Sequence, residues 1–177
     1  RDWMRWYVDS RWRPAERVGD LGGVPLRDLA IGPTDPWLAV VGERGLASLV
    51  RPESTQTVVT WRAHEGPIRQ VVFGGHGSWV ATAAGSEDKR VARWSVPEGR
   101  LLDSTLMSAP VAALAVSRDG AWLAAAGEDR VLRVWTPGGR VPAQELTSGP
   151  SAVSCLGFSP EGDRLYAGTR DGHVLVW

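Results

Sequence analysis

The sequence predicts an all-β protein, a β-propeller built of four-stranded antiparallel blades, with about four blades present and the last blade lacking its outer strand. Two series of tryptophans support this prediction. Trp37, Trp79 and Trp122 each follow a polar turn and open an alanine-rich run, at spacings of 42 and 43 residues. A second series, spaced by 41 and 42 residues, closes runs of alternating apolar residues and consists of Trp94, Trp135 and Trp177. Both periods lie in the range of about 40–45 residues that is typical of propeller blades.

The composition argues against several other classes of protein. The chain has 177 residues, no formal net charge and 43% hydrophobic residues. This balance argues against a nucleic-acid partner and against a membrane partner, because either would normally meet a basic face. No run reaches the roughly 18 apolar residues that a bilayer-spanning helix needs. The single cysteine, Cys155, excludes an internal disulfide and favours a reducing compartment, so a cytoplasmic location is expected.

The repeats divide the chain into four units. Alternating apolar residues such as Leu29 and Ile31 predict half-buried strands, and pairs such as Asp119-Gly120 predict hairpin turns between them. The expected blades cover residues 26–61, 62–106, 107–148 and 149–177. In the first blade, Leu49 stands where the other blades have the closing tryptophan. Residues 1–25 are less regular and are interpreted either as part of an earlier blade or as a linker.

Small side chains are expected in the middle of each blade. The alanines at positions 124–126 form a run too short for a helix and bounded by turns, so they predict a strand. In a propeller the blades pack face to face, and small residues let neighbouring sheets approach closely. Cys155 lies on a strand of the last unit that is expected to be buried.

Three segments carry a resemblance to a known family. SEDKRVARW, GEDRVLRVW and TRDGHVLVW each place an aspartate six residues before the closing tryptophan. With these segments in phase, residues 26–177 resemble the WD-repeat β-propeller family. The sequence departs from the family pattern after the tryptophan, where Ser95 and Thr136 stand in place of the usual aspartate. The resemblance implies a ring of about seven blades, so the missing blades are expected from the parent chain or from self-association.

The resemblance also implies a structural tetrad of hydrogen-bonded residues, His64, Thr82, Asp88 and Trp94. The indole N–H of a buried tryptophan needs an acceptor, which a hydroxyl supplies. The histidine then links that hydroxyl to the aspartate, and a fully satisfied network fixes the geometry of the blade.

Partial tetrads are expected in the third and fourth units. Their remaining members are Asp129, Trp135, Asp171 and Trp177. The hydroxyl and the histidine are replaced there by Ala125, Ala167, Met107 and Gly149. These two blades are therefore expected to rely on packing instead.

A threonine, a histidine and an aspartate together also resemble a nucleophilic triad. The structural interpretation is favoured, because the Thr82 hydroxyl would be buried and no oxyanion donors are indicated. No catalytic, cofactor-binding or metal-binding residue is predicted. His76, His173 and Cys155 lack zinc-site spacing. Residues 74–77 (GGHG) lack the lysine and the serine or threonine of a phosphate-binding loop.

The start of the chain is rich in arginine and tryptophan. Five arginines and three tryptophans lie among residues 1–17, as in a basic aromatic patch for nucleic acid. Because the chain carries no net positive charge, a strand end or a linker is the favoured interpretation.

The same resemblance implies that the loops around the turn aspartate lie on a face that often binds peptides or proteins. The candidate partner-binding residues are Glu87, Lys89, Arg90, Glu128, Arg130 and Arg170. Their mixed charges suit a charged peptide segment. The sequence thus predicts a non-catalytic protein–protein or peptide interaction scaffold or sensor module within a larger multidomain protein. Two alternatives stay open: an interaction region attached to an upstream signalling ATPase or kinase, and an enzyme that uses the central cavity of the propeller.

Overall fold

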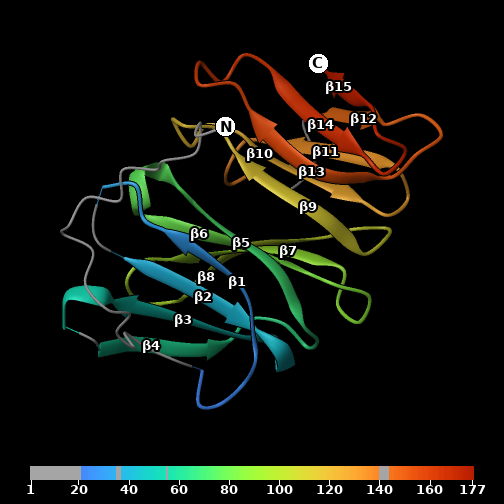
Figure 1. The fold of residues 1–177 in the computed structure, drawn as a ribbon. Helices are drawn as coiled ribbons and strands as arrows, with labels where there is room; N and C mark the ends of the chain where they lie inside the picture. Colours follow the sequence, from blue (N-terminus) through green and yellow to red (C-terminus); the bar gives the residue numbers. More distant parts are fainter. Residues whose placement is uncertain (1–20, 35–36, 55, 140–143) are drawn as a thin grey trace, which may run out of the picture.

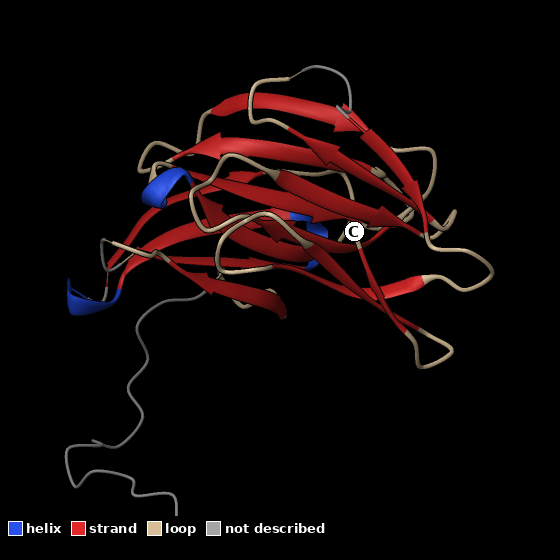
Figure 2. Ribbon diagram, turned by 90° about the horizontal axis from the view of Figure 1, so that it is seen from above, coloured by secondary structure: helices blue, strands red, loops and turns tan. Residues whose placement is uncertain are grey.

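Four antiparallel sheets follow one another along the chain, and the predicted all-β propeller architecture is confirmed (Figure 1). The computed structural model describes residues 21–34, 37–54, 56–139 and 144–177. In each sheet the strands neighbour one another in sequence order. Strands make up most of the described chain, and the only helical turns among these residues are short (Figure 2).

Each sheet is one blade, and its strands are numbered from the innermost outward. Blade 1 consists of β1 (Leu26–Ile31), β2 (Leu38–Gly42), β3 (Leu46–Arg51) and β4 (Gln56–Arg62). Blade 2 consists of β5 (Ile68–Gly74), β6 (Trp79–Ala84), β7 (Arg90–Ser95) and β8 (Leu101–Leu106). Blade 3 consists of β9 (Val111–Val116), β10 (Leu123–Gly127), β11 (Val131–Trp135) and β12 (Gln144–Thr147). Blade 4 consists of β13 (Val153–Phe158), β14 (Leu165–Thr169) and β15 (Val174–Val176). Single helical turns are η1 (Glu43–Gly45), η2 (Pro52–Ser54) and η3 (Gly75–Gly77).

The core consists of layers between consecutive blades. Between blades 3 and 4, Ala124 and Ala126 of β10 are fully buried and face Val153 and Ala167 of blade 4. Similar layers join blade 1 to blade 2 and blade 2 to blade 3. The small second-strand residues bring the sheets close, and larger residues of the neighbouring blade fill the space between them.

Hydrogen bonds from side chains also join the inner strands of neighbouring blades. Asp28 on β1 accepts a hydrogen bond from the backbone N–H of Val71 on β5, at 2.9 Å. One blade further, Gln70 on β5 accepts one from the backbone N–H of Leu114 on β9, at 2.7 Å. Asp28 and Gln70 each stand beside an irregularity in the pairing of the first two strands of their blade. The same kind of hydrogen bond to the next blade is therefore made from equivalent positions in blades 1 and 2.

Cys155 stands at the equivalent position of blade 4, where it pairs with Gly168 beside the same irregularity. The prediction that Cys155 is buried is wrong, because its side chain is exposed. No blade packs on this side of β13 within the described residues, so the strand is covered on one face only.

The expectation that Leu49 replaces the closing tryptophan is also wrong. Val50 occupies that place, because it pairs with Leu38 just as Trp94 pairs with Val80. Neighbouring residues of a strand face opposite sides, so a shift of one position changes the layer to which a side chain belongs. Leu49 accordingly packs towards blade 2 in the same cluster as Trp94.

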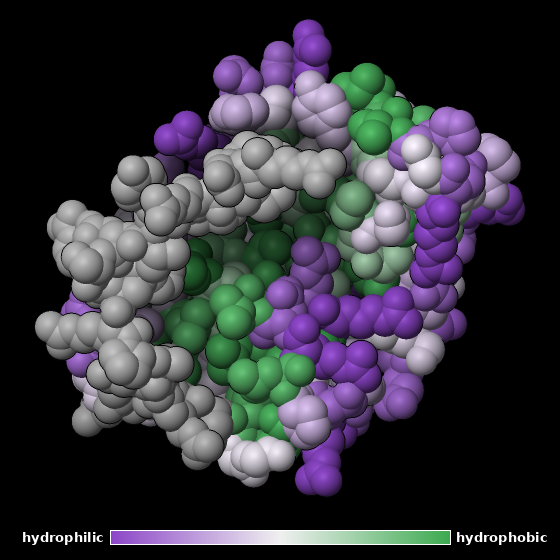
Figure 3. Space-filling model, viewed as in Figure 1, coloured by the Kyte–Doolittle hydropathy of each residue, from purple (hydrophilic) through white to green (hydrophobic). Residues whose placement is uncertain are grey.

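The first blade exposes apolar residues of its inner strand. Ile31 and Leu29 of β1 are 74% and 56% exposed, whereas Ile68 and Val71 of β5 are buried against blade 1. Hydrophobic surface is visible over this part of the molecule in Figure 3. Residues 21–25 cover part of blade 1, where Leu21 packs against the second and third strands. The rest of the expected partial blade or linker, residues 1–20, lies outside the described residues, as does the arginine-rich start.

Candidate functional site

The structure brings His64, Thr82, Asp88 and Trp94 into one hydrogen-bonded chain. The indole Nε1 of Trp94 donates to Thr82 Oγ1 at 2.8 Å. Thr82 Oγ1 lies 2.8 Å from His64 Nε2, and His64 Nδ1 lies 2.6 Å from Asp88 Oδ2. Thr82 comes from the buried strand β6 and Trp94 from β7, while Asp88 lies in the turn between these strands and His64 in the connection from β4 to β5.

The donor and acceptor roles in this network follow from its chemistry. An indole N–H only donates, so the Thr82 oxygen accepts from Trp94. The single hydroxyl proton of Thr82 is then free to point at His64 Nε2, which must accept. His64 Nδ1 consequently carries the proton that is donated to Asp88. Each of the four side chains has a hydrogen-bond partner in this network, which is the condition under which a buried network stabilises a fold.

Burial keeps His64 neutral. Its removal from water lowers its pKa below the ordinary value of 6.5, although the nearby carboxylate of Asp88 opposes the shift. A neutral ring with a single proton suits the network, since His64 Nε2 has to accept from Thr82. Thr82 is fully buried and its hydroxyl is already engaged on both sides, so it is not accessible to a substrate.

The third blade lacks the equivalent acceptor. Ala125 stands in the register position of Thr82, and the buried Nε1 of Trp135 has no hydrogen-bond partner among the residues that the structure describes. Met107, which replaces the histidine, is itself buried in the apolar layer. An unpaired buried N–H weakens this blade relative to the second.

The turn aspartate of the third blade is nevertheless held by a different network. Asp129 accepts hydrogen bonds from the Ser108 hydroxyl and from Arg133 Nη1, the latter at 3.2 Å. Arg133 also donates from Nη2 to Ser108 at 2.9 Å and from Nε to Glu145 at 2.8 Å. The expectation that this blade relies on packing instead of polar contacts is therefore wrong for Asp129.

The pKa of Asp129 reflects this network. Burial raises it, but the hydrogen bonds from Ser108 and the Val131 backbone, together with the charge of Arg133, hold it below the ordinary value. Arg133 pairs with Ala125 across the strands, as Ala92 pairs with Thr82, so it is the counterpart of Ala92. Sequence reasoning missed it because the tetrad pattern assigns no role to this position.

The fourth blade holds its turn aspartate in a third way. The Thr169 hydroxyl donates to Asp171 Oδ1 at 2.5 Å, and His173 Nδ1 lies 3.3 Å from Asp171 Oδ2. The Thr169 hydrogen bond contributes most to lowering the pKa of Asp171 to about 2. Ala167 is buried and Trp177 is half-buried, so the two remaining tetrad positions take part in packing only.

The candidate partner-binding residues fall into two groups. Glu128 ties three blades together, because its carboxylate lies 3.0 Å from Arg69 of blade 2 and 3.8 Å from Arg170 of blade 4. Arg130 lies in the same region and donates to the backbone carbonyl of Pro150 at 3.3 Å. Arg69 was missed because it lies 59 residues from Glu128 in the sequence.

The other three candidates belong to blade 2. Glu87 and Lys89 lie in the turn between β6 and β7, and the backbone of Lys89 adopts a left-handed conformation with φ of 54°. Arg90 begins β7 and reaches outward, with Nη1 3.3 Å from the Ser104 hydroxyl on β8. Arg90 therefore belongs to the outer side of the blade rather than to the surface around Glu128.

The described residues contain neither a cluster of metal-ligating side chains nor a membrane-spanning helix. No group of three or more histidine, cysteine, aspartate or glutamate side chains is placed to hold a metal ion in this part of the chain. No helix in the same residues is long and apolar enough to cross a membrane.

Sequence comparison identifies the family. The chain belongs to the WD40 family, described as WD domain, G-beta repeat, whose model matches residues 55–95, 102–136 and 141–177. The first match runs from the outer strand of blade 1 to the third strand of blade 2, so the sequence repeat is offset from the blade.

Several curated relatives share this repeat. The chain is 32% identical over 96 residues to Periodic tryptophan protein 2 homolog of Schizosaccharomyces pombe, covering 53% of this chain and 11% of the relative. It is 30% identical over 121 residues to Small ribosomal subunit protein RACK1y of rice, covering 64% and 35%. It is also 30% identical over 93 residues to Apoptotic protease-activating factor 1 of the rat, covering 52% and 7%. The chain thus spans between 7% and 35% of the length of these relatives.

Proposed function

We propose that this chain is a non-catalytic scaffold that binds a protein or peptide partner on the surface around Glu128. One observation carries the proposal: the carboxylate of Glu128 is shared by Arg69 and Arg170, so charged side chains of three blades form one surface. Surface charges of this kind select and orient partners more than they add affinity. A segment with both acidic and basic residues matches such a surface.

The network around His64 supports a role without catalysis. The three side chains that resemble a nucleophilic triad are engaged with one another and with Trp94, and the threonine has no exposed surface. An enzyme that used the central cavity would need acidic or histidine side chains on the inner strands. Among β1, β5, β9 and β13, Asp28 is the one such residue, and it accepts the backbone N–H of Val71.

The named relatives support a place in larger assemblies. The rice relative is named as a protein of the small ribosomal subunit, and the rat relative as a factor that activates apoptotic proteases. The alternative that this region is attached to an upstream signalling ATPase or kinase is retained as the second proposal. A cytoplasmic location is proposed from the single cysteine alone.

A peptide array tests the proposal. An array of 12-residue peptides with systematically varied acidic and basic residues is probed with the purified chain, and the strongest peptide is carried into titrations. Glu128→Arg is expected to weaken its binding at least tenfold, because it leaves Arg69 and Arg170 facing a third cation. Glu161→Arg, in the exposed turn between β13 and β14 at the opposite end of the strands, is the matched control. Equal effects of the two substitutions would overturn the proposal.

A further inference from the structure

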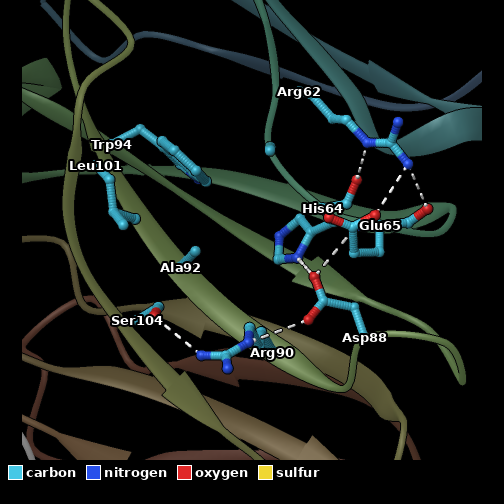
Figure 4. Close-up of a pocket in the computed structure, with 10 residues that line it drawn as sticks. Arg62, His64, Glu65, Asp88, Arg90, Ala92, Trp94, Leu101 and Ser104 are labelled. Atoms are coloured by element: carbon cyan, nitrogen blue, oxygen red, sulfur yellow. Dashed lines mark hydrogen bonds and ion pairs between the residues drawn. The ribbon is translucent and has the colours of Figure 1, made fainter.

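A groove of about 290 Å³ lies between the outer parts of blades 1 and 2 (Figure 4). Its apolar part consists of Ala92 and Trp94 of β7 together with Leu101 of β8. Leu101 is 55% exposed, so the groove offers apolar surface to solvent at its mouth. Covering such surface with a partner side chain is favourable in proportion to the apolar area removed from water.

Two arginines stand at the polar rim of this groove, and each is engaged through only some of its guanidinium nitrogens. Arg62 Nη2 lies 3.1 Å from Glu65 Oε2, and Arg62 Nε donates to the backbone carbonyl of His64 at 3.4 Å. Arg90 Nε lies 3.2 Å from Asp88 Oδ1, and its Nη1 donates to Ser104. Within the described residues, Arg62 Nη1 and Arg90 Nη2 make no hydrogen bond, so each guanidinium keeps donors available.

The acceptors of the rim are mostly occupied. Asp88 Oδ2 receives His64 Nδ1, and Asp88 Oδ1 receives Arg90. Glu65 Oε2 receives Arg62, which leaves Glu65 Oε1 as the free carboxylate oxygen of the rim. The arginine nitrogens without a partner therefore outnumber the carboxylate oxygens without one. The polar side of the groove is better suited to a ligand group that accepts hydrogen bonds than to one that donates them.

The equivalent groove between blades 2 and 3, which Arg133 lines, offers no arginine nitrogen without a hydrogen-bond partner. There Arg133 stands at the position of Ala92, and each of its three guanidinium nitrogens already donates to a partner, namely Glu145, Asp129 or Ser108. Its side chain is only 12% exposed, so it occupies space that Ala92 leaves open in the first groove. Two pairs of complete neighbouring blades lie within the described residues. Of these, only the pair of blades 1 and 2 forms at this position a groove that combines arginine nitrogens without a partner with accessible apolar surface.

We propose that the groove between blades 1 and 2 binds an extended peptide segment in which an apolar side chain stands next to an acidic one. The apolar side chain covers Trp94 and Leu101, and the carboxylate accepts hydrogen bonds from the guanidinium groups at the rim. Charge-assisted hydrogen bonds between arginine and carboxylate are the strong ones of their kind. The proposal rests on the chain being an interaction scaffold, but it uses a surface separate from Glu128.

The test uses the whole chain, labelled with ¹⁵N, and three short capped peptides that contain Leu-Glu, Leu-Gln or Leu-Lys between glycines. The Leu-Glu peptide is expected to shift the amide signals of Ala92, Leu101 and Ser104. Its dissociation constant should be at least threefold lower than that of Leu-Gln, and Leu-Lys should bind most weakly. Similar constants for the three peptides, or no shift of these signals, would overturn the proposal.

Single substitutions show which residues of the groove bind the carboxylate and the apolar side chain of the peptide. Arg90→Gln is expected to remove the preference for Leu-Glu over Leu-Gln, whereas Arg118→Gln, in the exposed turn between β9 and β10, should keep it. Leu101→Ser should weaken all three peptides without changing thermal stability, because Leu101 is largely exposed. Glu128→Arg should leave these titrations unchanged, which separates this proposal from the proposed function. Shifts of the same signals on concentrating the chain alone would mean that a second copy fills the groove, and the proposal would be wrong.

Discussion

Replacing Thr82 with valine removes the central oxygen of the buried network while keeping the shape of the side chain. Trp94 Nε1 loses its acceptor at 2.8 Å and His64 Nε2 loses the partner at 2.8 Å. Each buried polar group left unpaired costs about 1–3 kcal/mol. The expected loss is therefore about 2–6 kcal/mol for the two groups, a large part of the roughly 5–15 kcal/mol that stabilises a typical domain.

Urea denaturation followed by tryptophan fluorescence measures this loss. The matched control is Thr105→Val on β8, a half-buried threonine whose hydroxyl makes no hydrogen bond among the described residues. The control should change the free energy of unfolding by less than about 0.5 kcal/mol, as is usual for residues outside such networks. If Thr82→Val falls within the same range as the control, the network does not stabilise the blade and the reasoning is refuted.

Three further predictions concern the other polar groups. Ala125→Ser should raise the free energy of unfolding by about 1 kcal/mol, because it offers an acceptor to the unpaired Trp135 indole. Arg133→Met should lower it by about 1–3 kcal/mol, because the partly buried carboxylate of Asp129 loses a charged donor; Arg118→Gln is the exposed control. Stability should fall as the pH drops below about 6.5, since the unfolded chain protonates His64 while the folded chain, with its lowered pKa, does not.

Each of these predictions has an outcome that would contradict it. A lower thermal midpoint for Ala125→Ser would mean that the blade has no room for the hydroxyl. Equal urea midpoints for the substitutions at Arg133 and Arg118 would remove the role given to the guanidinium. For the pH dependence, His64→Gln should flatten the change in stability between pH 7.5 and 5.5, and an unchanged slope would assign it to other groups.

The blades could be predicted because they depend on a repeated local pattern, and the four positions around Thr82 because they match the tetrad of the family that the chain resembles. The turn aspartate and closing tryptophan recur in phase, and the second-strand positions follow from strand alternation. The network of Ser108, Asp129 and Arg133 did not follow the repeat, because Ser108 lies in a connection and Arg133 replaces an alanine. Such a replacement changes the chemistry of one blade without changing the pattern of the family.

Contacts between blades were harder to predict, because the repeated pattern of one blade does not specify which residues meet across the boundary to the next. Glu128 meets Arg69 and Arg170 only after three blades have been placed side by side. The exposure of Cys155 likewise depends on which face of β13 another blade covers, which the residues of the strand do not specify. That Val50 rather than Leu49 stands opposite Leu38 depends on the pairing of β2 with β3, which the spacing of the repeats does not specify to the residue.

The most direct test of the proposed scaffold is the ratio of dissociation constants for the array-selected peptide between Glu128→Arg and Glu161→Arg. Both variants reverse one charge, at opposite ends of the strands, and urea denaturation checks that both are folded under the conditions of the titration. We predict binding at least ten times weaker for Glu128→Arg than for Glu161→Arg. A ratio near one, with both variants folded, would contradict the claim that the surface around Glu128 binds the partner.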